Sequence, residues 1–149
     1  MHDGARAIVE RVERSDALFG SKLAVMTALT ALPASHGVAA WDGGEAAPVD
    51  RLAIARAIAF VRALPEGCEM PEIAVDPDGA VSLDWVPSRN RMLSISISGE
   101  HDRLAYAWID GADRGSAVSR FDGGTIPQRL LQAIASVSTL TAYVALRAA

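Results

Sequence analysis

The sequence predicts an α+β domain in which an antiparallel β-meander of about five strands is covered on one face by helices. Three observations predict this fold class. Residues 71–109 alternate apolar and polar side chains through four short runs, which is the period typical of half-buried strands. Asp78-Gly79 separates the first two runs, and this pair is typical of a tight hairpin turn with positive φ at both positions. Segments on either side of the meander carry apolar residues at helical spacing.

Two helical segments are predicted before the meander, at residues 1–33 and 48–64. Pro33 and the small polar residues after it are expected to end the first, and 38–47 is predicted to be an ordered loop. In the second segment Pro48 suits the first turn, Asp50 is a candidate N-cap and Pro65 ends the helix. Apolar residues surround most of this second helix, which predicts packing on more than one side.

The meander is predicted over residues 71–121. Ile73 and Val75 are expected to pair with Val81, Leu83 and Trp85 across the first turn. A fifth strand is expected at 117–121, after a loop at 110–115. A last helix is predicted at 126–147, with Thr125 as its candidate cap, and its apolar stripe predicts that it lies on the sheet. The whole chain, 1–149, is interpreted as a single domain.

Composition excludes several classes of function. The formal net charge is −4 and the 14 Lys and Arg residues are scattered, so nucleic-acid binding is not expected. The single cysteine, Cys68, forms no internal disulfide, which favours a cytoplasmic location. No signal peptide is predicted at the charged N-terminus. The uncharged run 130–146 is short and contains polar residues, so no membrane span is expected.

No residue is predicted to be catalytic, and no metal or cofactor is expected. Asp76-Pro77-Asp78-Gly79 resembles the start of a calcium loop, but a strand follows at once, which favours a hairpin turn. Glu100-His101-Asp102 is either an acid/base cluster or simply a polar turn. Acidic neighbours are expected to raise the pKa of Cys68, which argues against a thiolate nucleophile. Neither a nucleophile elbow nor a phosphate-binding glycine motif is found.

Two sets of residues are candidates for binding. Ser94 and Ser96, with Ser82 and Asp84 beside them, predict a flat polar sheet face that accepts another protein surface; the alternative is an ordinary solvated face. Trp41, on its glycine-flanked loop, is the best candidate for an exposed tryptophan. Asp42, Trp85 and Arg89 are the other candidates for lining a pocket between this loop and the sheet.

A series of short motifs gives a resemblance to a family. It consists of Trp41-Asp42-Gly43, Pro48, Leu64-Pro65, Pro71-Glu72-Ile73, Asp78-Gly79, Leu83-Asp84-Trp85 and Ile126-Pro127. It is similar to a W-D-G, L-P, P-x-I, D-G and L-E-W pattern in a family of small bacterial proteins without an established activity. The likeness covers about residues 41–137. This chain departs from the pattern at Asp84, where Glu is usual, and at Gly44-Glu45. The resemblance implies a shared fold, and each motif has a structural role, which favours a scaffold signature.

These observations predict a non-enzymatic, cytoplasmic, bacterial protein-interaction or regulatory module. Its partner is an unidentified protein or a second copy of the chain. The alternative is a small-molecule-binding domain or an enzyme with a pocket near the Trp41 loop. A third class, a metal-assisted hydrolase, requires metal in the purified protein.

Overall fold

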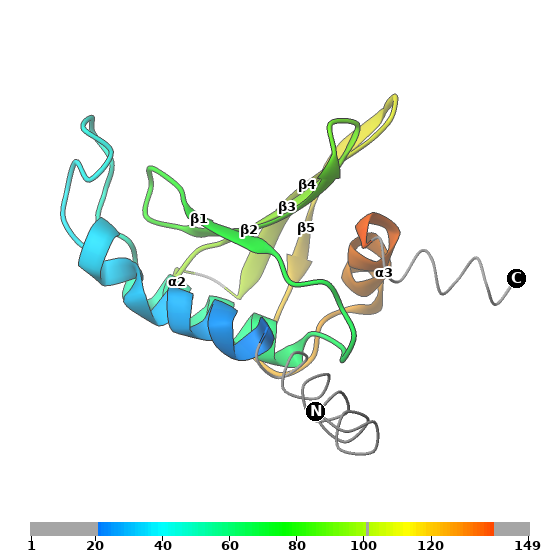
Figure 1. Cartoon of the computed structure of the whole chain (residues 1–149), viewed down its shortest axis with the longest axis horizontal. Coiled ribbons are helices and arrows are strands. Elements are labelled where there is room, and N and C mark those ends of the chain that lie inside the picture. Colours follow the sequence, from blue (N-terminus) through cyan, green and yellow to red (C-terminus); the bar gives the residue numbers. More distant parts are fainter. Residues whose placement is uncertain (1–20, 101, 139–149) are drawn as a thin grey trace, which may run out of the picture.

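The computed structural model describes residues 21–100 and 102–138, and it confirms the predicted α+β fold class (Figure 1). Five antiparallel strands form one sheet in the order β1-β2-β3-β4-β5, so each strand pairs with its neighbours in sequence. Their bounds are β1 (Glu72–Val75), β2 (Val81–Ser88), β3 (Arg91–Ile97), β4 (Arg103–Asp110) and β5 (Asp113–Arg120). As expected, β1 pairs with β2, through Ile73 with Leu83 and Val75 with Val81. Trp85, also expected in this pairing, lies beyond the end of β1 and pairs only with Leu93 of β3.

Helices cover one face of this sheet. α2 (Arg51–Ala63) and α3 (Gln128–Val137) lie on the same side of it, and each contacts β2 and β3 (Figure 1). The large apolar residues of the strands point to this side because side chains alternate between the two faces of a strand. Leu83, Leu93 and Ile95 are fully buried there. Phe60 of α2 meets Phe121 edge to face, with ring centroids 5.3 Å apart.

The start of α2 is capped as its sequence predicts. Asp50 is the N-cap, and its Oδ1 accepts hydrogen bonds from the backbone N–H groups of Leu52 at 2.8 Å and Ala53 at 3.4 Å. At the other end, Nζ of Lys22 donates to the carbonyl oxygens of Arg62 at 3.1 Å and Leu64 at 2.5 Å. These carbonyls have no partner within the helix, so Lys22 satisfies them and joins α2 to the preceding helix.

That preceding helix extends further than predicted. Residues 21–36 are helical, so the helix continues through Pro33 for most of a turn, while residues 1–20 of the predicted segment lie outside the described residues. Proline removes one backbone hydrogen bond, but its fixed φ is compatible with a helical backbone. Gly37 follows the helix, and a Cβ built there would lie 2.3 Å from the carbonyl oxygen of Pro33. The helix therefore ends at His36, and the next position has space only for glycine.

The turn between β1 and β2 differs in detail from the predicted two-residue turn. Asp78 does not have a positive φ, whereas Gly79 has a φ of 91°. The N–H of Gly79 donates to the Asp76 carbonyl at 2.9 Å and that of Asp76 donates to the Ala80 carbonyl at 2.8 Å. This is a three-residue loop that ends in a left-handed glycine. Its Gly79 carbonyl accepts from the N–H of Asp50 at 2.9 Å, so the turn is fixed to the start of α2.

The last strand and the last helix also have corrected bounds. β5 begins at Asp113 rather than at Ala117, because Gly111 and Ala112 alone form the turn after β4. Thr125 does not cap α3; Pro127 occupies the N-cap position, and the Asp122 side chain accepts from the N–H groups of Gly124 and Thr125 instead. α3 ends at Val137, and residues 139–147 of the predicted helix lie outside the described residues.

Candidate protein-binding face

The face of the sheet that points away from α2 and α3 is called the open face here (Figure 1). Small side chains make up its centre, in two cross-strand rows. One row runs Ala74, Ser82, Ser96, Ala105 and Val118, and the next runs Glu72, Asp84, Ser94, Ala107 and Ser116. The exposed fraction of Val118 is 65% and that of Val86, on the same face of β2, is 51%. The centre of the open face therefore lacks large side chains, and apolar side chains are exposed toward its margins.

Ser94 and Ser96 belong to a hydrogen-bonded network of serines and aspartates on this face. Oδ1 of Asp84 accepts from the hydroxyls of Ser82 at 2.7 Å and Ser94 at 2.6 Å, and the two hydroxyls lie 3.2 Å apart. The hydroxyl of Ser96 donates to Oδ2 of Asp76 at 3.0 Å. The sequence prediction that these serines lie together with Ser82 and Asp84 agrees with this geometry.

Burial raises the pKa of the Asp76 carboxyl above its ordinary value of 3.8. The hydrogen bond from Ser96 opposes this shift, while the negative charges of Asp78 and Asp84 add to it. The network thus holds two carboxylates near one another, and the charge of Asp84 contributes to the raised pKa of Asp76. No histidine or lysine hydrogen-bonds to these serines among the described residues, so the Ser–His and Ser–Lys pairs that commonly activate a serine nucleophile are not formed there.

The charges of the open face are divided between its two sides. Three acidic side chains lie on or directly after β1 and β2, namely Glu72, Asp76 and Asp84. Three arginines lie on the same face of β4 and β5, namely Arg103, Arg114 and Arg120. Sequence reasoning missed these arginines. The two-residue alternation of β4 gives Arg103 the same face as Ala105, whereas Arg114 lies in the loop that the sequence predicts at 110–115.

The four other predicted binding residues do not share a described hollow. Trp41 is half-buried, its Nε1 donates to the Ala47 carbonyl at 2.7 Å, and its ring meets His36 with centroids 4.4 Å apart. The Asp42 side chain accepts from the Gly44 N–H at 2.8 Å. Both residues therefore stabilise their own loop.

Trp85 lies on the opposite face of the sheet from the serines, in the core. Its exposed fraction is 2%, and its Nε1 donates to the Glu69 carbonyl at 2.8 Å. Arg89 is exposed in the turn after β2. The Trp41 loop contacts the turn before β2, through the bond from Ala47 N–H to the Pro77 carbonyl, so Trp41 and Arg89 lie at opposite ends of that strand.

A hollow of about 350 Å³ lies beside α2 at the β3–β4 end of the sheet. It is lined by Ala55, Arg56, Ala59, Gly99, Glu100, Asp102, Phe121, Asp122 and Gly123. Nη1 of Arg56 donates to the Ser98 carbonyl, whereas Nη2 is buried and has no hydrogen-bond partner among the described residues. The N–H groups of Thr125 and Gly124 lower the pKa of Asp122 on the rim.

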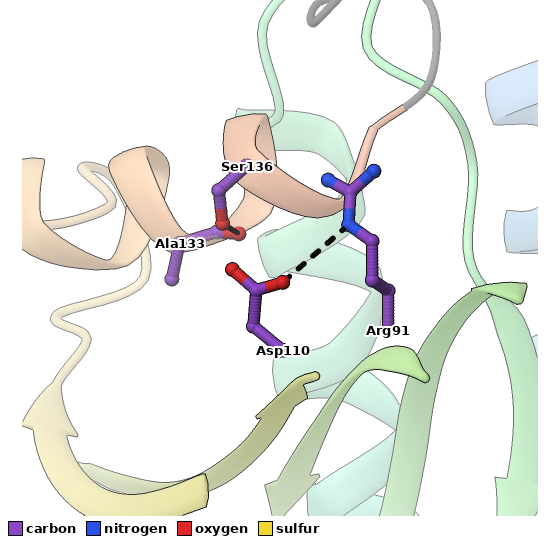
Figure 2. A network of polar contacts seen from close by, with 4 residues as sticks. All are labelled: Arg91, Asp110, Ala133 and Ser136. Carbon is purple, nitrogen blue, oxygen red and sulfur yellow. Dashed lines mark hydrogen bonds and ion pairs between the residues drawn. The ribbon is translucent and has the colours of Figure 1, made fainter. Parts of the chain in front are cut away.

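On the helix side of the sheet, Arg91 and Asp110 form a cross-strand ion pair. Figure 2 shows the two side chains pointing toward one another beside the turn of α3 that carries Ser136, with Nε of Arg91 3.9 Å from Oδ1 of Asp110. The Ser136 hydroxyl donates to the Ala133 carbonyl at 2.8 Å and so takes no part in the pair. Both charged side chains are exposed, so the pair adds little stability.

Neither a metal site nor a membrane-spanning helix is found among the described residues. No group of three or more His, Cys, Asp or Glu side chains is placed to hold a metal ion within residues 21–100 and 102–138. No helix in these ranges combines the length and apolar character needed to cross a membrane. His101, the centre of the predicted acid/base cluster, lies outside the described residues.

The chain matches no family model, no curated protein and no solved structure. The resemblance to the W-D-G pattern therefore stays a prediction.

Proposed function

We propose that this chain is a non-enzymatic protein-binding module that docks another protein on the open face of its sheet. The observation that carries the proposal is the composition of that face, where a centre of small serine and alanine side chains lies between exposed valines and two bands of opposite charge. Small side chains let a partner surface approach the backbone closely, and charged margins set its orientation. A cytoplasmic, regulatory role in a bacterium belongs to the same proposal.

The nucleophiles in the described part of the chain favour binding over catalysis. The hydroxyls of Ser82, Ser94 and Ser96 donate to carboxylates within the network. Burial raises the pKa of the Cys68 thiol to about 11, so this side chain is protonated at neutral pH. Neither type of group is prepared for attack on a substrate.

Affinity capture from the source organism tests the proposal with one matched pair of variants. Ala107 is exposed in the centre of the open face, and Ala31 is exposed on the helix 21–36. A bound protein should be retained by wild type and by Ala31→Arg but lost with Ala107→Arg. The arginine side chain at position 107 would project from the centre of the open face and prevent close contact with a partner. Equal capture by both variants contradicts the proposal.

A small-molecule-binding function is the second candidate, and the buried Nη2 of Arg56 beside the hollow favours it. A guanidinium with a vacant donor suits a carboxylate or phosphate ligand. A thermal-shift screen with carboxylates and phosphates tests it. An increase in melting temperature that disappears in Arg56→Met supports this function, whereas no increase argues against it.

A further inference from the structure

The two charged bands of the open face are complementary to one another. The acidic residues Glu72, Asp76 and Asp84 lie toward the β1 edge, and the arginines Arg103, Arg114 and Arg120 lie toward the β5 edge. The face therefore carries equal numbers of positive and negative side chains, separated by the width of β3. A surface divided in this way is complementary to a second copy of itself whose acidic side lies over its basic side.

Two arginines of the basic band repel one another and form no ion pair within the described part of the chain. Arg103 and Arg120 are direct cross-strand partners, and like charges in this position destabilise a sheet. Among the described residues the ion pair formed is Arg91–Asp110, so neither arginine has an acidic partner in that part of the chain. A carboxylate supplied from outside would offset the repulsion between them.

We infer that the protein docked on the open face is a second copy of this chain, related by a two-fold axis that runs parallel to the strands along β3. This inference rests on the proposed function, because it names the partner of the same face. The axis places β1 and β2 of one copy over β5 and β4 of the other, so the acidic side of each copy faces the basic side of its partner. An axis across the strands would place acid on acid, which costs free energy.

The strand register brings particular residues together. Val75, Val81, Ile97, Leu104 and Ser119 form one cross-strand row. Asp76 and Arg120 each lie one residue beyond this row, at the same end of the sheet, because β1 and β5 run in the same direction. The two-fold axis therefore sets Asp76 of each copy opposite Arg120 of the other.

The centre of the face fits the same arrangement. In the row that contains Ser96, the axis places Ser96 over its own counterpart, Ser82 over Ala105 and Ala74 over Val118. Sheets that pack face to face lie about 10 Å apart, and small side chains permit at least this approach. Val118 then loses its exposure to water against a small residue.

Sedimentation of the full chain, over protein concentrations from micromolar to millimolar, tests the inference through charge reversal. We expect wild type to dimerise. Arg120→Asp alone and Asp76→Arg alone should each raise the Kd by roughly 10- to 100-fold, since each dimer loses two attractive pairs and gains two repulsive ones. The double variant should recover the wild-type Kd. An equimolar mixture of the two single variants should form a heterodimer.

Controls separate the interface from the fold. Arg51→Asp reverses an exposed charge on α2, away from the face, and should leave the Kd unchanged. Circular dichroism monitors folding of every variant. If Asp76→Arg fails to fold, Ala105→Arg replaces it, because it puts a bulky charge on an exposed alanine of the same row and should also weaken the dimer.

Cross-linking tests the position of the axis independently of charge. In a Cys68→Ser background, Ser96→Cys should give a covalent dimer with a short bismaleimide, whereas Ala31→Cys should not. The inference is overturned by a chain that stays monomeric throughout, by a Kd that Arg120→Asp does not change, or by absence of the heterodimer. A monomeric chain whose captured protein is still lost with Ala107→Arg would overturn the second copy as partner and leave the proposed function standing.

Discussion

The ring of Trp108 lies directly against Gly115, its cross-strand partner on β5. A Cβ built on Gly115 would be 2.2 Å from Cζ2 of Trp108. Replacing a strand glycine with alanine ordinarily adds about 0.5–1 kcal/mol of stability because it restricts the unfolded chain. Here the added methyl group has no space, since the indole ring already occupies it.

We expect Gly115→Ala to lower the free energy of unfolding by about 1–3 kcal/mol, the usual cost of overpacking. Urea denaturation followed by circular dichroism measures the change. Gly44→Ala is the control, because the nearest atom to a Cβ built there is a carboxylate oxygen at 3.4 Å. A Gly115→Ala variant as stable as wild type would mean that the ring does not occupy this space.

Lys22 joins the helix 21–36 to the C-terminal end of α2 through its bonds to the carbonyls of Arg62 and Leu64. We expect Lys22→Met to destabilise the fold by about 1–2 kcal/mol, because two carbonyls lose a charged donor while the apolar stem is kept. Thermal and urea unfolding measure the loss. Lys22→Arg retains a donor and should restore most of the stability; equal loss in both variants would show that these bonds are not the cause.

Asp76 gives the stability a defined dependence on pH. Its folded-state pKa is raised above 3.8, so the folded protein binds this proton more tightly than the unfolded chain does. The proton's contribution to stability is complete below 3.8 and is lost as the pH rises through the folded-state pKa. Asp76→Asn should therefore be more stable than wild type at neutral pH, and the difference should shrink on acidification.

The comparison is made by urea denaturation at a series of pH values, with both proteins in the Arg120→Asp background so that association does not contribute. Asn keeps an oxygen that accepts the Ser96 hydroxyl. A difference that is constant with pH, or that grows as the pH falls, would contradict the raised pKa of Asp76.

Cys68 should react slowly with thiol reagents in the folded protein. Burial raises the pKa of its thiol to about 11; the charge of Lys22 opposes this shift, and a smaller contribution from Glu69 adds to it. The sequence predicted the direction of the shift from the acidic neighbours, whereas the main cause is burial.

Alkylation of Cys68 by iodoacetamide should therefore accelerate as the pH rises toward 11. The urea-unfolded chain should react faster near pH 8.5, the ordinary value for a cysteine, at about which half of its thiol is ionised. Equal rates in the two states would be contrary to this expectation.

The meander was predictable because the alternation of apolar and polar residues from Ile73 to Trp108 assigns each side chain to one face without knowledge of the tertiary structure. The cap at Asp50 was predictable for the same kind of local reason. The extent of β5 was not. Asp113, Arg114 and Gly115 have the composition of a loop, and they form a strand because their backbone pairs with β4. Glycine at position 115 also leaves the space that the ring of Trp108 occupies.

The candidate site divides in the same way. Ser94 and Ser96 were assigned to one face from their spacing alone, but the pairing of Asp76 with Ser96 depends on two chain segments separated by a whole hairpin. The sequence by itself determined which side chains share a face, because a strand alternates with a fixed period. Only the tertiary structure decided which face the described helices leave uncovered and that its acids and arginines lie on opposite sides, because these follow from long-range strand pairing and from the side on which α2 and α3 pack.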